Sequence, residues 1–224
     1  MVRPEYTKRD ESAAVEIIQM PKTDKEIDTS REKTRQELML IKKAKAGDRI
    51  AFERLADQYY GNIFRMISYR TQNRMDAEDL TQEVFLKAYK GLSRLTDEEH
   101  FKGWLFRIAV NRVHDFHRRK KFLHLFKSFT NDDVDAHMEA QTRSDSGPLE
   151  TLIRKRFRQE SQTFLSRLSG MEKDVFMLRF MDQLQINEIA AALKKGESTV
   201  KTHLYRALSK FKKDRAFQRF LKGE

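Results

Sequence analysis

Residues 101–121, FKGWLFRIAVNRVHDFHRRKK, constrain the fold most, because a single helix there would carry both a core-forming side and a basic side. At about 100° per residue, the apolar residues gather on one broad side of that helix. They are Leu105, Phe106, Ile108, Ala109, Val110, Val113 and Phe116. Steps of four, three and four residues place Arg107, Asn111, His114 and Arg118 together on the opposite side. The pattern predicts a helix that packs within a helical domain and presents a basic face to an anion.

Positive charge is concentrated in two short segments. The 224 residues carry a formal net charge of +11. Residues 101–121 hold seven Lys and Arg against one acidic residue, and residues 194–215 hold eight against two. An excess of this size indicates a polyanionic partner, either nucleic acid or an anionic membrane surface. No apolar run is long enough to span a bilayer and no signal peptide is visible, so we expect a soluble protein whose membrane link, if any, comes through a partner.

Helical spacing of apolar residues recurs along the chain and no β pattern competes with it. We therefore expect an all-α protein of two small helical domains joined by a flexible linker. The predicted parts are a disordered or partly helical arm (1–35), a first domain (36–121), a linker (122–149), a second domain (150–215) and a tail (216–224). Within the first domain we expect a helix with Asp76 as its N-cap and Asp79 in its acidic first turn. The apolar end of the linker, residues 122–129, is expected to pack on the first domain or on a partner, or to be simply part of the last helix of the first domain.

Residues 185–208, QINEIAAALKKGESTVKTHLYRAL, have the form of a helix-turn-helix with Gly196 in the turn. Val200, Leu204 and Ala207 would be the buried side of the second helix. Its exposed side chains would lie over base edges in the DNA major groove; they are Ser198, Thr199, Lys201, Thr202, His203 and Arg206. The alternative is an ordinary helical hairpin with a solvated basic face.

Residues 76–92, DAEDLTQEVFLKAYKGL, predict an amphipathic helix whose outer face is mostly acidic. That face holds Asp76, Asp79, Gln82, Glu83 and Lys87. Acidic side chains repel phosphate, so in a basic protein they favour a protein partner, although a solvated face is the default interpretation.

Sequence features of catalysis and metal binding are weak. His114, Asp115 and His117 offer two imidazoles on one side of a helix, but no third strong ligand is near and the arginines repel a cation. No Gly-rich phosphate loop or nucleophile motif appears, and there is no cysteine. We therefore expect no enzyme, no catalytic residue, no metal or other cofactor, and no small-molecule substrate. Trp104, the only tryptophan, is either a core aromatic or a wall for an unstacked base.

Four strings in order give the chain a resemblance to a known family. They are AKAGDRIAFERLADQYYGNIFRMI, DAEDLTQEVFLKAYKGL, FKGWLFRIAVNRVHDFHRRKK and LSGMEKDVFMLRFMDQLQINEIAAALKKGESTVKTHLYRAL. The chain resembles bacterial RNA polymerase sigma factors of the extracytoplasmic-function (ECF) class, within the sigma-70 superfamily. The resemblance covers residues 37–121 and about 150–213.

The resemblance implies binding to core RNA polymerase and recognition of promoter DNA. The polymerase contacts implied are the β′ coiled coil, reached by Asp79, Gln82 and Glu83, and the β flap. The −10 element would be read and melted by residues 96–102 and by Asn111, in a set that comprises Phe101, Lys102, Arg107, Asn111, His114, Arg118, Arg119 and Lys120. The −35 element would be read through the exposed residues of the predicted helix-turn-helix.

The family also implies a location and a regulator. We expect a cytoplasmic protein that an anti-sigma factor, often membrane-bound in the family, holds inactive at the inner face of the membrane. Two alternatives stay open. One is a sigma-like decoy that sequesters an anti-sigma factor without binding DNA, and the other is a stand-alone helix-turn-helix regulator.

Overall fold

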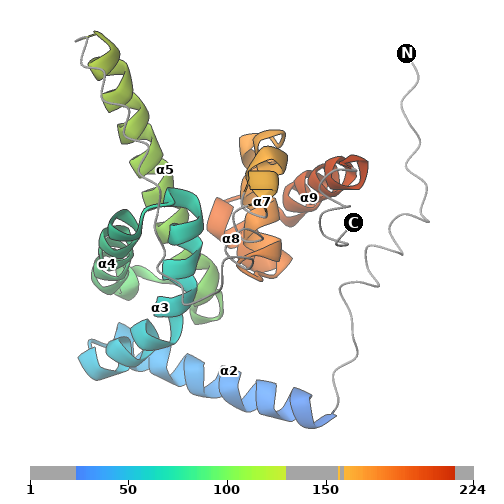
Figure 1. Cartoon of the computed structure of the whole chain (residues 1–224). Helices are drawn as coiled ribbons and strands as arrows, with labels where there is room; N and C mark the ends of the chain where they lie inside the picture. The colour runs from blue at the N-terminus through green and yellow to red at the C-terminus, as the bar shows by residue number, and fades with distance from the viewer. Residues whose placement is uncertain (1–23, 130–155, 157–158, 215–224) are drawn as a thin grey trace, which may run out of the picture.

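The computed structural model describes residues 24–129, 156 and 159–214, and every regular element in these ranges is helical (Figure 1). The elements are α2 (Asp24–Lys45), α3 (Arg49–Thr71), α4 (Arg74–Gly91), the short 3-10 turns η1 (Leu92–Arg94) and η2 (Glu98–His100), α5 (Phe101–Phe129), α7 (Gly170–Phe180), α8 (Ile186–Leu193) and α9 (Glu197–Lys213). Residues 159–166 add a helical stretch before α7. The all-α prediction is confirmed.

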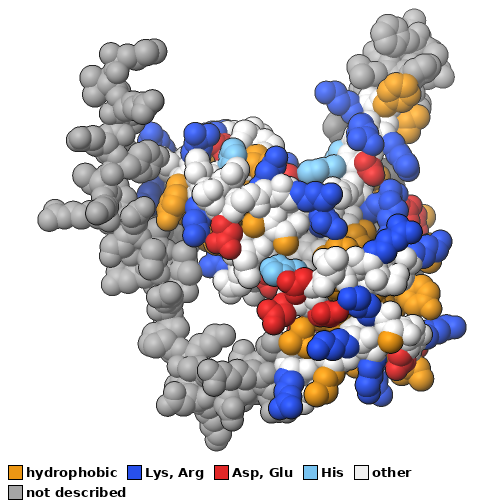
Figure 2. All heavy atoms as spheres, turned by 180° about the vertical axis from the view of Figure 1, so that it is seen from behind, with side chains coloured by type: hydrophobic (Ala, Val, Ile, Leu, Met, Phe, Trp, Pro, Cys, Tyr) orange, Lys and Arg blue, Asp and Glu red, His pale blue; other side chains and the backbone are white. Residues whose placement is uncertain are grey.

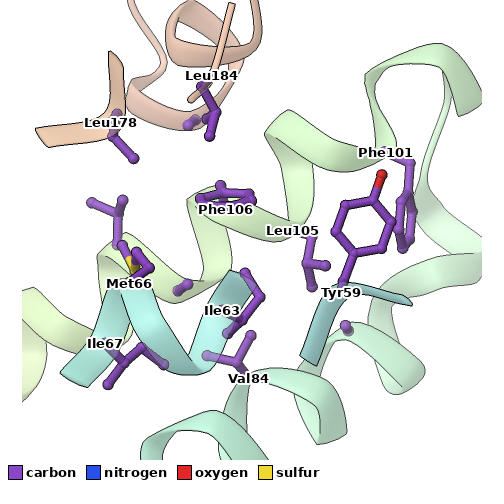
Figure 3. Close-up of a cluster of buried hydrophobic side chains, with 14 of the residues drawn as sticks. Tyr59, Ile63, Met66, Ile67, Val84, Phe101, Leu105, Phe106, Leu178 and Leu184 are labelled. Atoms are coloured by element: carbon purple, nitrogen blue, oxygen red, sulfur yellow. The ribbon is translucent and has the colours of Figure 1, made fainter. Parts of the chain in front are cut away.

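Helices α2 to α5 form the first domain around one apolar core. Ile63, Met66 and Ile67 lie on α3 at the spacing of one helix face, and all three are fully buried. Val84 on α4 and Leu105 on α5 complete the centre of this core (Figure 3). The apolar side predicted for the helix of residues 101–121 therefore faces inward, which leaves its other side available.

Side-chain caps fix where α3 and α4 begin. Asp48 accepts a hydrogen bond from the backbone N–H of Ala51 at 3.0 Å and so starts α3. Asn73 does the same for α4, because its Oδ1 accepts from the N–H of Asp76 at 3.1 Å. The predicted cap at Asp76 is therefore wrong: Asp76 is the residue whose N–H is capped, and it lies inside the first turn.

Helices α7, α8 and α9 form the second domain, and α8 and α9 confirm the predicted helix-turn-helix. Ser169 and Glu172 make a reciprocal capping box at the start of α7. Lys194, which ends α8, has a left-handed backbone with φ of 53°. Gly196 then precedes α9 with an ordinary φ of −70°. The turn therefore places its strained conformation on a lysine two residues before the glycine.

Two predicted boundaries shift. Helix α2 begins at Asp24, well inside the predicted N-terminal arm. Helix α5 continues to Phe129, so residues 122–129 extend a helix that projects from the first domain and do not begin an irregular linker (Figure 1). Residues 1–23 of the predicted arm, residues 130–149 of the linker and the whole tail lie outside the described residues, as do residues 150–155, 157–158 and 215 of the predicted second domain.

The two domains pack against each other. Leu178 on α7 and Leu184 in the turn after it belong to the same buried cluster as Met66 and Phe106 of the first domain. Figure 3 shows the two leucines facing those side chains across the boundary. Helix α8 lies along α5, with most of the contact between the domains made by this pair. Among the described helices, none combines the length and apolarity that a membrane span requires.

Candidate promoter and polymerase interfaces

The solvent side of α5 carries five of the eight residues of the predicted −10 set. Asn111, Arg118, Arg119 and Lys120 are exposed, and Arg107 is half-buried. Arg118 donates to the carboxylate of Asp115 at 2.9 Å within the same helix. Lys120 lies 5.7 Å from the centre of the Phe116 ring. An amide and three cations thus share one accessible stretch of helix, which suits a nucleic-acid strand.

The other three residues of the predicted −10 set are buried or paired with other side chains. Phe101 is 2% exposed and packs edge-to-face on Tyr59 at 5.5 Å, so its ring belongs to the core and offers no surface to DNA. Lys102 is paired with Glu188 of α8 at 3.0 Å. His114 is paired with Asp174 of α7 at 3.1 Å. The structure therefore buries Phe101 and pairs Lys102 and the exposed His114 with carboxylates of the second domain, and it leaves the other members of the predicted set accessible.

Trp104 is half-buried beside Phe101, with ring centres 5.8 Å apart. A Cβ built on Gly91 would lie 3.4 Å from the indole, so the ring also packs against the end of α4. These contacts favour a structural role for most of the ring.

The pKa values of His114 and His117 are shifted in opposite directions. The hydrogen bond to Asp174 raises the pKa of His114, whereas burial lowers the pKa of His117. No group of three potential ligands occurs among the described residues. The contact that the structure gives His114 is a carboxylate from the second domain.

The acidic face predicted for α4 is present and accessible. Asp79, Gln82 and Glu83 are all exposed. Beside them, Tyr60 stacks with Phe64 and with Phe85 at 6.0 and 6.1 Å, and Leu86 and Tyr89 are also exposed. An acidic edge next to exposed apolar side chains is typical of a surface that binds protein.

Arg112 is a residue that the sequence did not single out. It is 8% exposed and donates to Glu83 on α4 and, at 3.4 Å, to Asp115 on α5. The contact between Arg112 and Glu83 thereby joins the acidic face of α4 to α5, the helix that carries the basic face. The only signal in the sequence is an arginine next to Asn111 on the core side of a helix.

The recognition helix α9 keeps its predicted polar face outside. Ser198, Thr199, Lys201, Thr202 and Arg206 are exposed, while His203 is half-buried. Among the described residues, the buried Nδ1 of His203 has no hydrogen-bond partner. Val200, Leu204 and Ala207 are buried, as predicted. Lys and Arg side chains recur over the face of the molecule in Figure 2, with fewer acidic side chains among them.

Two family models match the chain. The one described as Sigma-70 region 2 matches residues 55–122, and the one described as Sigma-70, region 4 matches residues 158–211. The two matches together cover more than half of the sequence. The chain belongs to the sigma-70 family.

Its relatives place this sigma factor in the ECF class. It is 33% identical to the ECF RNA polymerase sigma factor BldN of Streptomyces coelicolor over 170 residues, which span 75% of this chain but only 62% of BldN. It is 28% identical to the ECF RNA polymerase sigma factor SigW of Bacillus subtilis over 174 residues, 77% of this chain and 93% of SigW.

A solved structure shares the fold. It is the sigma factor RpoE in complex with the anti-sigma factor NepR from Bartonella quintana, with a TM-score of 0.52 and 20% identity. The match covers 76% of this sigma factor and 96% of that chain. Helices α3 to α5 thus correspond to region 2, and α7 to α9 to region 4.

Proposed function

We propose that this sigma factor directs core RNA polymerase to promoters through three surfaces carried by three different helices. The acidic face of α4 binds the polymerase, the solvent side of α5 holds the −10 element, and α9 reads the −35 element in the major groove. The family supplies the overall activity, and the observation that supports this division is the separation of charge. Asp79 and Gln82 are exposed on α4, whereas Arg118 and Arg119 are exposed on α5.

The −10 role assigned to α5 follows from the kinds of side chain on it. Cations at residues 118–120 can follow phosphates without reading sequence. The Asn111 amide, about two helical turns before them, can both donate to and accept from a base edge. Extruding a base from the duplex costs a few kcal/mol, and a positioned amide with neighbouring cations offsets part of that cost.

The −35 role assigned to α9 follows from its position as the second helix of a helix-turn-helix. Ser198, Thr199 and Thr202 lie in its first two turns, where such helices contact base edges. Lys201 and Arg206 supply positive charge on the same exposed side. The chain itself contributes binding and positioning, and the polymerase forms the RNA chain.

An anti-sigma factor is the regulator that we propose. RpoE in the structure from Bartonella quintana is bound to the anti-sigma factor NepR. A partner of this class would cover some of the same surfaces here. The site of action that follows from this function is the cytoplasm, where polymerase and chromosome are found, with an anti-sigma factor able to hold the protein at the membrane.

Transcription with core RNA polymerase on a library of randomised promoters tests the function. We expect protein-dependent transcripts whose templates share one −10 motif and one −35 motif at fixed spacing. A library without any enriched motif, or transcripts that do not depend on the protein, would contradict the proposal and favour a decoy that only binds an anti-sigma factor.

A further inference from the structure

Four charged side chains of alternating sign run from the acidic face of α4 to the basic side of α5. Arg112 of α5 donates from one terminal nitrogen to Glu83 of α4 and from the other to Asp115 at 3.4 Å. The second carboxylate oxygen of Asp115 accepts from Arg118 at 2.9 Å. This chain of contacts joins a residue of the proposed polymerase surface to a residue of the proposed −10 surface.

Arg112 is the buried centre of the chain, and both ends of the chain reach solvent. The side chain of Arg112 is 10% exposed, whereas those of Glu83 and Arg118 are 47% and 80% exposed. Among the described residues, the buried Nε of Arg112 has no hydrogen-bond partner. The two terminal nitrogens therefore hold the guanidinium, and Glu83 and Asp115 compete for one buried positive charge.

Asp115 is shared in the same way between two cations. While Glu83 takes part of the Arg112 charge, Asp115 keeps its contact with Arg118. If another cation engages Glu83, Arg112 can turn fully to Asp115, because the two residues are neighbours three apart on α5. Asp115 then holds Arg118 less tightly. The Arg118 guanidinium becomes available to a phosphate, which accepts the same charge-assisted hydrogen bonds as a carboxylate.

We propose that Arg112 is a positioning residue that couples polymerase binding on α4 to phosphate binding on α5. A cation of the polymerase that pairs with Glu83 releases Arg118 for the −10 strand, through Arg112 and Asp115. The coupling is reciprocal, so a strand that holds Arg118 strengthens binding at Glu83 by the same factor. The proposal rests on the functions proposed above for the acidic face of α4 and the solvent side of α5.

Glu83→Gln imitates the engaged state, because the amide has a similar shape but does not hold the Arg112 charge. We expect the full-length variant to bind a short fluorescein-labelled single DNA strand of mixed sequence more tightly than the parent protein. The exposed pair of Arg118 with Asp115 is weak, which limits the gain to about two- to fivefold. Glu78→Gln is the matched control, because Glu78 also lies on α4 and pairs with an arginine, but with Arg74 of the same helix. Its strand affinity should equal that of the parent.

Two double-variant cycles separate the coupling from a general effect of charge. Arg112→Met removes the centre of the chain and leaves no buried charge unpaired, because Glu83 and Asp115 both reach solvent. Asp115→Asn breaks the link to Arg118 near the surface, and it gives the answer if Arg112→Met does not fold. Alone, Arg112→Met should weaken strand binding and Asp115→Asn should tighten it. In either background, Glu83→Gln should have no further effect.

An equal gain from Glu83→Gln in the parent and in both backgrounds would overturn the coupling, since charge alone would then explain the gain. A loss of affinity in Glu83→Gln would also overturn it, because that sign is expected if Glu83 and Arg112 only stabilise the fold. Arg118→Ala identifies a failure of the proposed −10 role, since the variant would then bind the strand as the parent does. If Arg118→Ala binds more weakly and Glu83→Gln is unchanged, the −10 role stands and only the coupling is wrong.

Discussion

The guanidinium of Arg70, near the end of α3, donates to the carboxylate of Asp182 at 2.9 Å across 112 residues of chain. The two side chains are 7% and 2% exposed, so this is the most deeply buried of the three ion pairs between the domains. Burial raises the pKa of Asp182, and the neighbouring positive charge of Arg70 opposes that rise. A buried pair of this kind depends on both partners being present.

Asp182→Ala tests that dependence. Removal of the carboxylate leaves the Arg70 guanidinium buried without its counter-charge. In comparable buried pairs this lowers the free energy of unfolding by about 3–5 kcal/mol. We expect the domains to separate before region 2 unfolds. Energy transfer between two dyes, attached to the double variant Gln58→Cys with Lys213→Cys, should therefore fall at low urea. Asp57→Ala, on the exposed side of α3, should change the unfolding free energy by less than about 0.5 kcal/mol. Equal behaviour of the two variants would show that Arg70 finds other partners.

We expect the contact between the domains to depend on pH through His114, and His117 to give the protein a pH dependence of the opposite sign. The pKa of His114 is raised by its bond to Asp174, with a further contribution from Asp115 and opposition from burial and Arg70. Its contribution to the contact between the domains is therefore full below the ordinary value of about 6.5 and is lost as pH rises through the raised pKa. His117, whose pKa is lowered chiefly by burial, contributes stability that is lost as pH falls through its lowered pKa.

Asp174→Asn separates the two histidines. The substitution removes the charge that protonated His114 needs, so we expect the His114 pKa to fall while that of His117 stays below its ordinary value. An NMR titration of the imidazole carbon-bound protons measures both pKa values. A His114 pKa that does not respond would mean that the contact with Asp174 is not formed in solution.

The elements of each domain could be predicted from the sequence because their causes are local. Apolar residues three and four apart define the buried sides of α3, α4, α5 and α9 without reference to the other domain. The N-cap of α4 was predicted wrongly because Asn73 and Asp76 are both good N-cap residues. Only the backbone conformation shows that Asn73 is the residue outside the helix. The exposed positions of Asn111, Arg118 and Asp79 were predictable for the same reason.

The ion pairs between the domains could not be predicted, because their partners are 60 to 112 residues apart and nothing in the sequence sets their register. Lys102 was assigned to DNA by the family resemblance and His114 by its place on the polar side of the helix, since the sequence does not show that Glu188 and Asp174 lie against them. Gly103 looks like an ordinary helix-weakening residue until α8 is placed above it. The length of α5 was underestimated because the charged run at residues 118–121 resembles a helix end.

Asn111→Ala tests base recognition by α5. Loss of the amide should weaken discrimination at one −10 position by about 1–3 kcal/mol, the value of a good amide–base contact. Polymerase affinity should not change, because Asn111 lies on a different helix from the acidic face. Competition between −10 probes with single-base changes measures the effect, with Gln58→Ala as the exposed-amide control. Equal weakening at all positions would assign Asn111 to backbone binding.

Arg118→Ala with Arg119→Ala tests phosphate binding. Both side chains are exposed, and the pair that Arg118 makes with Asp115 lies at the surface, so little stability is lost. We expect affinity for every −10 probe to fall by a similar factor. The slope of log affinity against log salt concentration should become shallower by roughly 1.4, since each single-strand phosphate contact contributes about 0.7. An unchanged slope would show that these arginines do not contact phosphates. Arg49→Ala, at the exposed start of α3, serves as the control for loss of an arginine away from α5.

Charge reversal on α4 tests the polymerase surface, and the structure shows why two variants are needed. Glu83→Lys should weaken binding to core polymerase, but it also places a lysine against buried Arg112 and so lowers the stability of region 2. Asp79→Lys reverses charge on the same exposed face, one helical turn earlier, without disturbing Arg112. We expect both variants to lose polymerase affinity and only Glu83→Lys to unfold at lower urea. If Asp79→Lys binds polymerase normally, the effect of Glu83→Lys is a loss of the Arg112 anchor, and the acidic face is a solvated surface.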